Sequence, residues 1–296
     1  MTHAQSLSTT GDSSLVELTG LPTTSPIGYM AAIGLVRVLY EDCELDVKLG
    51  WQGGHAVLDG IREDALIAAL LNHMVDRHQA PEWNWNHSTR GVTPEQYNQT
   101  VADLSGDGRA LSFLAAFATD AVITQKGSVG NTRLDLTSGQ QALIRNLRDV
   151  AKALAQSEKA EASFRSTLFG GAYEDQHAFG WDPAAVLNHA HQAIAPTRMK
   201  KAGKAAMVWL AAESLALHPL FPGPGRVATP GVQRMDNATV YHWSVWQGVV
   251  GLPTIRALRL LDLFSARQVP GITEQWISVI GSSGKYGAML PARRVR

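Results

Sequence analysis

The sequence predicts an α+β protein, with a mixed N-terminal part of short strands and helices followed by a helix-richer C-terminal part. Two observations support this fold class. Short alternating segments are interspersed with longer segments of helical periodicity, without a repeat of fixed period. The apolar content is 45% and the charged content is 18%, which is typical of a folded globular chain. We expect a flexible N-terminal tail over 1–14, an N-terminal α+β domain over 15–180 and a basic C-terminal domain with a few strands over 181–296.

The N-terminal domain is expected to start with a strand over 15–21, followed by a helix. Ser25 is suited to cap this helix, and Pro26 suits its first turn. Gly28 and Gly34 within the helix indicate close packing against a neighbouring element. The other expected elements are a hairpin around 52–54, helices over 61–77, from Thr93, over 109–121 and over 139–156, and a strand over 133–136.

The C-terminal domain is expected to contain one strongly apolar helix, AAMVWLAAESLAL, which follows the basic segment 196–204. The segment ATVYHWSVW (238–246) alternates in the manner of a strand. Pro253 is suited to begin a helix through 264, and EQWISVI (274–280) predicts a further strand.

Several features of the composition limit the class of protein. The chain has no run of about 18 apolar residues, so no membrane span is expected. The polar first residues do not resemble a secretory signal. Cys43 is the single cysteine, which excludes an internal disulfide and fits a reducing cytoplasm. We therefore expect a cytoplasmic protein.

Charge is distributed unevenly along the chain. Residues 1–180 hold 13 Lys and Arg against 21 Asp and Glu, a balance of −8, whereas residues 181–296 hold 13 against 5, a balance of +8. Such a division favours a nucleic-acid-facing half, and the alternative is a basic face matched to an acidic protein neighbour.

A search for catalytic and metal-binding motifs finds no convincing one. The ten histidines are scattered without a metal-ligand spacing, and acidic neighbours of Cys43 disfavour a reactive thiolate. We therefore expect no catalytic residues, no metal and no cofactor. A hydrolase with a site around Asp175 and His177 remains as a competing hypothesis.

Basic residues form four groups, which indicate a function more clearly than the histidines and the cysteine do. Arg145 and Arg148 lie on one face of the helix expected over 139–156, together with Lys152. This face is either an ordinary solvated surface or a phosphate-contacting one. The other three groups are Arg198, Lys200, Lys201 and Lys204; Arg256 and Arg259; and Arg293, Arg294 and Arg296.

The loop GSSGKYG (281–287) has the composition of an anion-binding loop but lacks the spacing of a nucleotide-binding one. Lys285 is a candidate to contact a nucleic-acid phosphate, and Tyr286 is a candidate to stack on a base. The alternative is an ordinary turn between two strands.

Several longer segments together resemble a known family. These segments are LTGLPTTSPIGYMAAIGLVRVL, VKLGWQGGHAVLDG, LDLTSGQQALIRNL, FGWDPAA and AAMVWLAAESLALHPLF, followed by YHWSVW. They are similar to segments of compact Csb-type large subunits, of the Cas-eight class, in type I-G (formerly I-U) CRISPR Cascade complexes. The resemblance extends from about residue 15 to 290. It implies a non-catalytic subunit of a ribonucleoprotein complex that functions in antiviral defence.

The resemblance also implies partners and a function. Such a subunit binds crRNA and target double-stranded DNA near the protospacer-adjacent motif, aids strand separation and recruits a helicase-nuclease in trans. It also contacts the backbone and guide-processing subunits. A structural adaptor that contacts only protein partners is the alternative function.

Two adjacent glutamines are the residues that we assign to the motif-facing or guide-facing surface. Gln140 and Gln141 are suited to this because glutamine makes bidentate contacts with adenine. Ser138 and Gln141 also match a helix capping box, which explains Gln141 without any ligand. Gln140, with Arg145 and Arg148, is therefore the more specific candidate for nucleic-acid contact.

Overall fold

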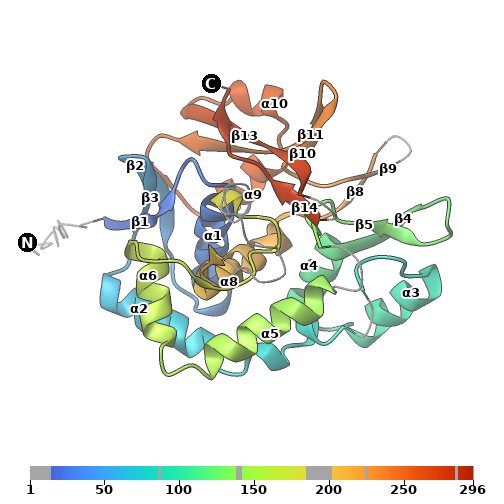
Figure 1. Cartoon of the computed structure of the whole chain (residues 1–296), viewed down its shortest axis with the longest axis horizontal. Coiled ribbons are helices and arrows are strands. Elements are labelled where there is room, and N and C mark those ends of the chain that lie inside the picture. The colour runs from blue at the N-terminus through green and yellow to red at the C-terminus, as the bar shows by residue number, and fades with distance from the viewer. Residues whose placement is uncertain are drawn as a thin grey trace, which may run out of the picture.

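A computed structural model describes residues 15–85, 88–137, 142–184, 202–223, 226–283 and 286–295 (Figure 1). The chain combines α-helices with antiparallel sheets, which confirms the predicted α+β class. The predicted tail over 1–14 lies outside the described residues. In the described part of the chain, no helix combines the length and the apolar character needed to cross a membrane.

Within the described residues, the strands form two larger sheets and three small two-stranded pairs. The first sheet has the order β1–β3–β2–β12, and the second has the order β10–β11–β13–β14, with β15 also paired to β13. The strands are β1 (Val16–Pro22), β2 (Lys48–Gln52), β3 (His55–Asp59), β4 (Ala118–Ile123), β5 (Val129–Asn131), β6 (Glu174–Asp175), β7 (Ala202–Gly203), β8 (Phe221–Gly223), β9 (Arg226–Ala228), β10 (Val232–Met235), β11 (Ala238–Trp246), β12 (Val249–Val250), β13 (Ile272–Ser283), β14 (Tyr286–Met289) and β15 (Arg293–Arg294).

The helices α1 and α8 lie at the centre, while α2, α5 and α6 lie on the side away from the second sheet (Figure 1). The helices are α1 (Pro26–Arg37), α2 (Glu63–Met74), α3 (Pro94–Asp103), α4 (Gly108–Phe117), α5 (Leu143–Ala155), α6 (Ala160–Phe169), α8 (Ala205–Glu213), α9 (Leu252–Arg259) and α10 (Leu263–Arg267). Short helical turns are η1 (Val38–Asp42), η2 (Arg77–Gln79), η3 (Pro81–Trp83) and η5 (Ser214–Leu217).

Local signals in the sequence place the start of α1 correctly. The Ser25 side chain accepts a hydrogen bond from the Gly28 amide at 3.1 Å, and Pro26 occupies the first turn. Gly34 provides the predicted close packing, because a Cβ there would lie 1.9 Å from the Leu210 carbonyl oxygen of α8. The helices α1 and α8, which are both almost wholly buried, thus contact each other backbone to backbone.

The hydrophobic core is continuous across the predicted domain boundary at 180/181. Buried apolar residues from both predicted domains belong to one cluster, and β12 extends the N-terminal sheet by pairing with β2. Two tryptophans of β11 reinforce this connection: Trp243 Nε1 donates to the Thr23 carbonyl at 2.8 Å, and Trp246 Nε1 donates to the Leu49 carbonyl at 3.0 Å.

The region around 133–137 differs from its prediction as a strand. Strand β5 ends at Asn131, and the backbone then turns. Asp135 Oδ1 accepts hydrogen bonds from the Thr137 amide at 3.1 Å and from the Arg90 guanidinium at 2.9 Å. An aspartate that bonds the backbone two residues ahead stabilises a turn in place of extended pairing.

Helix boundaries also differ from those predicted. The helix expected over 109–121 ends at Phe117, after which β4 begins, and α6 lies in a region for which no helix was predicted. The helix expected over 253–264 is divided into α9 and α10, because Asp262 caps α10 by accepting from the Ser265 amide at 2.7 Å.

The C-terminal part is not helix-richer as predicted, since strands exceed helices among its described residues. The strand β11 was predicted from its alternation, but β13 is longer than the 274–280 segment and spans Ile272–Ser283. The physical reason is pairing: β13 pairs with β11 from Ile272 to Val279 and then pairs with β14 from Ile280 to Ser283.

Candidate nucleic-acid interface and a buried charge cluster

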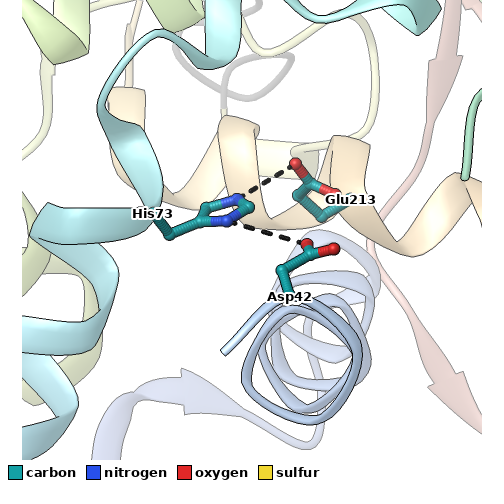
Figure 2. A group of neighbouring side chains, drawn as sticks. All are labelled: Asp42, His73 and Glu213. Atoms are coloured by element: carbon teal, nitrogen blue, oxygen red, sulfur yellow. Dashed lines mark hydrogen bonds and ion pairs between the residues drawn. The ribbon is translucent and has the colours of Figure 1, made fainter. Parts of the chain in front are cut away.

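Glu213 at the C-terminal end of α8 is the centre of a buried charge cluster. Its side chain is fully buried, and its Oε2 accepts hydrogen bonds from Arg37 Nη1 at 2.7 Å and from Arg109 Nη2 at 2.6 Å. His73 of α2 lies between Glu213 and Asp42, with its Nε2 3.4 Å from Glu213 Oε1 and its Nδ1 3.6 Å from Asp42 Oδ2 (Figure 2). Side chains from α1, α2 and α4 therefore meet at one carboxylate of α8.

Arg109 extends the cluster to the turns that follow α2. Its guanidinium binds Asp42 and donates to Glu82 Oε1 at 2.7 Å, and Arg77 binds the same Glu82 oxygen. At the other side, Arg37 Nε lies 2.8 Å from Glu41, which also binds Arg256. The charge cluster thus consists of Arg37, Arg77, Arg109, Arg256, Glu41, Asp42, Glu82, Glu213 and His73.

The electrostatics of the cluster favour the ionised form of Glu213. Burial alone would raise the pKa of Glu213, but Arg109, the hydrogen bond from His73 and Arg37 outweigh burial and lower that pKa below its usual range. For Arg109, burial opposes the charge, but Glu213, Asp42 and Glu82 raise its pKa further. Four arginines and four carboxylates balance one another, so the cluster is neutral when His73 is neutral.

Asp42, His73 and Glu213 are also a potential metal-binding group, because each offers a ligand atom and these atoms lie within 4.8 Å of one another. The arginines argue against this use. A divalent cation would have to lie beside two guanidinium groups that already donate to Glu213, and Arg109 also holds Asp42. The arrangement therefore fits a structural ion network better than a metal centre or an acid–base pair.

The sequence interpretation did not find this cluster, although one signal was present. Arg37 and Glu213 are isolated charges at the ends of otherwise apolar helices, and such charges are buried only when they are paired. The pairing itself joins residues 176 positions apart. No pattern of spacing along the chain indicates it.

The predicted basic face of α5 lies at the protein surface. Arg145 is exposed, Arg148 is partly exposed, and Lys152 is exposed one turn further on. Arg148 Nη1 donates to the Asn84 side-chain carbonyl at 3.3 Å. Arg148 and Lys152 line an open hollow of about 440 Å³, in which they face residues that follow α2. We call this feature the α5 hollow.

The predicted start of α5 differs from the structure. The helix begins at Leu143, with Ala142 as its N-cap and without a side-chain cap bond, so it starts after the predicted Ser138–Gln141 capping box. Gln140 and Gln141 themselves lie outside the described residues.

The second basic group is only partly described. Arg198, Lys200 and Lys201 lie outside the described residues. Lys204 is buried, with its Nζ donating to the Ser166 carbonyl at 3.0 Å and lying 5.8 Å from the centre of the Tyr173 ring. Burial lowers the pKa of Lys204, although the charges of Asp182 and Glu174 oppose this change. Its ammonium group thus binds other groups of the protein interior, whereas the sequence predicted a position at the surface.

The described parts of the GSSGKYG segment belong to the strands β13 and β14. Ser283 of β13 pairs with Tyr286 of β14, so only two residues join the strands. Lys285 lies outside the described residues, and Tyr286 is described only by its backbone in β14.

The last two basic groups are divided between the surface and the interior. Arg256 is paired with Glu41, whereas Arg259 is buried between the rings of Tyr29 and Tyr241 and donates to the His242 carbonyl at 3.1 Å. Arg293 and Arg294 form the exposed strand β15, and Arg296 lies outside the described residues.

The competing hydrolase site receives little support from its histidine. His177 Nδ1 accepts the amide hydrogen of Phe179 at 2.9 Å, and the His177 ring packs edge-on against the Phe179 ring. Asp175 contributes backbone to β6, which pairs with β7. These contacts give His177 a structural function in a local turn.

No protein-family model and no curated protein matches this chain.

Proposed function

We propose that this chain is the non-catalytic large subunit of a type I-G-like CRISPR Cascade complex, a crRNA-guided ribonucleoprotein that functions in the cytoplasm in antiviral defence. In this function it binds target double-stranded DNA near the protospacer-adjacent motif and aids strand separation. It recruits a separate helicase-nuclease and contacts the backbone and guide-processing subunits. The segments between about 15 and 290 that resemble such subunits support the family.

The observation that carries the nucleic-acid contact is the exposed charge of α5. Arg145, Arg148 and Lys152 lie at the surface, and in the described part of the chain none of them has a carboxylate within 4.0 Å. By contrast, arginines in the interior of the N-terminal part are bound to carboxylates. Exposed cations without an acidic partner are suited to a polyanion.

The charge cluster supports a non-catalytic function. Each carboxylate of the cluster has an arginine partner, and Glu213 is fully buried. A carboxylate that is held ionised by two guanidinium groups is a poor general base, because its pKa lies below the range that proton transfer at neutral pH requires.

Reconstitution with partner subunits tests the proposal. The full chain should be co-expressed with a guide RNA and with the subunits encoded by its neighbouring genes, and the purified assembly footprinted on duplex targets. We expect this chain to protect the duplex beside the protospacer-adjacent motif, with binding that weakens steeply as salt rises from about 50 to about 200 mM.

Variants of α5 separate DNA binding from a pure adaptor function. The triple substitution R145A/R148A/K152A should weaken binding to all duplex sequences, whereas K126A/K159A, which removes exposed cations elsewhere, should have little effect. Assembly with normal protein partners but without protection of the duplex by this chain would instead favour the structural adaptor.

A further inference from the structure

The α5 hollow is formed by two segments that are distant in the sequence. Arg148, Asp149 and Lys152 of α5 line one side, and His78, Gln79 and Asn84 line the other. The hollow has a volume of about 440 Å³ and is open to solvent.

The wall opposite α5 is held in place by hydrogen bonds. The Asn84 amide nitrogen donates to the carbonyls of Gln79 at 2.8 Å and Ala80 at 3.0 Å, so its side-chain oxygen is directed to Arg148. Gln79 is held in turn by Asp76 Oδ1 at 2.8 Å. The guanidinium of Arg148 is therefore oriented before any ligand arrives.

The same wall is anchored from inside by the charge cluster. Arg77 and Glu82, at either end of the segment that carries His78 and Gln79, are bound to one another, and Glu82 is also bound to Arg109. One face of the 77–84 segment thus contributes to the interior ion network, while the other lines the hollow. A surface site supported in this way keeps its geometry.

The charge of the hollow favours an anion. Arg148 has one neutral acceptor, Asn84, and in the described part of the chain neither Arg148 nor Lys152 has a carboxylate within 4.0 Å. Asp149 is the one acidic residue in the lining, so the hollow carries a net charge of +1 when His78 is neutral.

We propose that the α5 hollow binds a backbone phosphate of a nucleic-acid strand, with Arg148 as the principal donor and Lys152 as a second cation. This inference rests on the proposed function, which supplies the polyanion. A guanidinium matches the spacing of two phosphate oxygens, and Asn84 occupies only one of its five N–H groups.

Two single substitutions in the lining test this site without removing its cations. In N84D a carboxylate lies beside Arg148 and should compete with phosphate, so affinity for a fluorescent single-stranded oligonucleotide should fall about tenfold. D149N removes the one acidic group and should raise affinity a few-fold. Wild-type affinity for both variants of the full chain would overturn the site.

Neutral linkages identify the ligand as a backbone phosphate. We expect R148A to lower the slope of log affinity against log salt by about 0.7, the value for one single-strand phosphate. An oligonucleotide with one methylphosphonate at the contacted linkage should bind wild type as weakly as R148A binds the unmodified strand. The R148A variant should bind the methylphosphonate strand as tightly as it binds the unmodified strand. Additive losses at every linkage would contradict this assignment.

The outcomes distinguish the site from the proposed function. The wild-type chain could bind oligonucleotides in a salt-sensitive manner while N84D and D149N bind them with wild-type affinity. In that case the assignment of the phosphate site to the α5 hollow is wrong, and the proposed function stands. If the wild-type chain binds no nucleic acid, alone or assembled, both are wrong. Competition by inorganic phosphate as effective as that by the oligonucleotide, at equal phosphate concentration, would indicate a small-molecule site and overturn the nucleic-acid ligand.

Discussion

Arg109 and Arg148 represent two regions that use arginine in opposite ways. Arg109 lies in the charge cluster with three carboxylates around it, whereas Arg148 borders the α5 hollow with one neutral amide oxygen as its partner. The difference follows from solvation. A buried cation requires partners inside the protein, which are carboxylates for Arg109 and two tyrosine rings with a backbone carbonyl for Arg259, but a surface cation is stabilised by water. Arginines without acidic partners are therefore informative only at the surface, where they are available for a ligand.

The largest expected effect is the removal of the central carboxylate. Glu213→Gln keeps the size of the side chain but leaves Arg37 and Arg109 without their shared negative charge. We expect the free energy of unfolding, measured by urea denaturation, to fall by about 3–5 kcal/mol. A loss below about 1 kcal/mol would mean that water or neighbouring groups solvate the cluster, and the contrast with the surface would fail.

Acid should lower the stability of the folded interior, where two histidines are buried. Burial, with the charge of Arg259 adding to it, lowers the pKa of His242 to about 3 and that of His218 well below its ordinary value. Because the unfolded chain binds these protons first, stability is fully present above pH ~6.5 and is lost as the pH falls toward the folded pKa values. For His242 we expect a loss of about 2 kcal/mol between pH 6.5 and about pH 4.5, and His218 should contribute a loss in the same direction.

The control for this prediction is His242→Gln, which removes one of the two titrating groups. Its urea-derived stability should fall less steeply with acid than that of wild type, by up to about 1.4 kcal/mol per pH unit. An unchanged slope in the variant would show that other groups control acid unfolding.

Removing the surface cations should affect binding and leave stability nearly unchanged. For R148A/K152A we expect oligonucleotide affinity to fall at least about tenfold, with the free energy of unfolding within about 0.5 kcal/mol of wild type. K126A/K159A removes the same charge from other exposed positions and serves as the matched control. A large loss of stability in R148A/K152A would show that these residues have a structural function, as the buried arginines do.

The smallest expected effect is at Arg165, which matches Arg109 in the number of carboxylate partners but not in burial. It lies 2.6 Å from Glu63, 2.8 Å from Glu161 and 3.5 Å from Asp64, all at the surface. Because water and salt screen such pairs, the thermal midpoint of Arg165→Ala should coincide with that of wild type within error. A marked shift would show that partner number, and not burial, decides the contribution of an arginine.

The sequence predicted correctly those elements that form through interactions between residues close together in the chain. The start of α1, the hairpin at Gly53 and Gly54, and the alternating strand β11 were predicted correctly, because caps, turns and side-chain alternation act within a few residues. The strand predicted over 133–136 was wrong because Asp135 forms a local turn with Thr137 and binds Arg90 from 45 positions away. That last contact has no local signal.

The candidate site shows the same division. The sequence by itself determined that Arg145, Arg148 and Lys152 share one helical face, since their spacing of three and four residues matches the helix period. Only the tertiary structure decided that Asn84 orients Arg148, that Lys204 is buried, and that Arg37 meets Glu213. The physical reason is that a charge acquires its function from the groups around it in space, and packing brings those groups from distant parts of the chain.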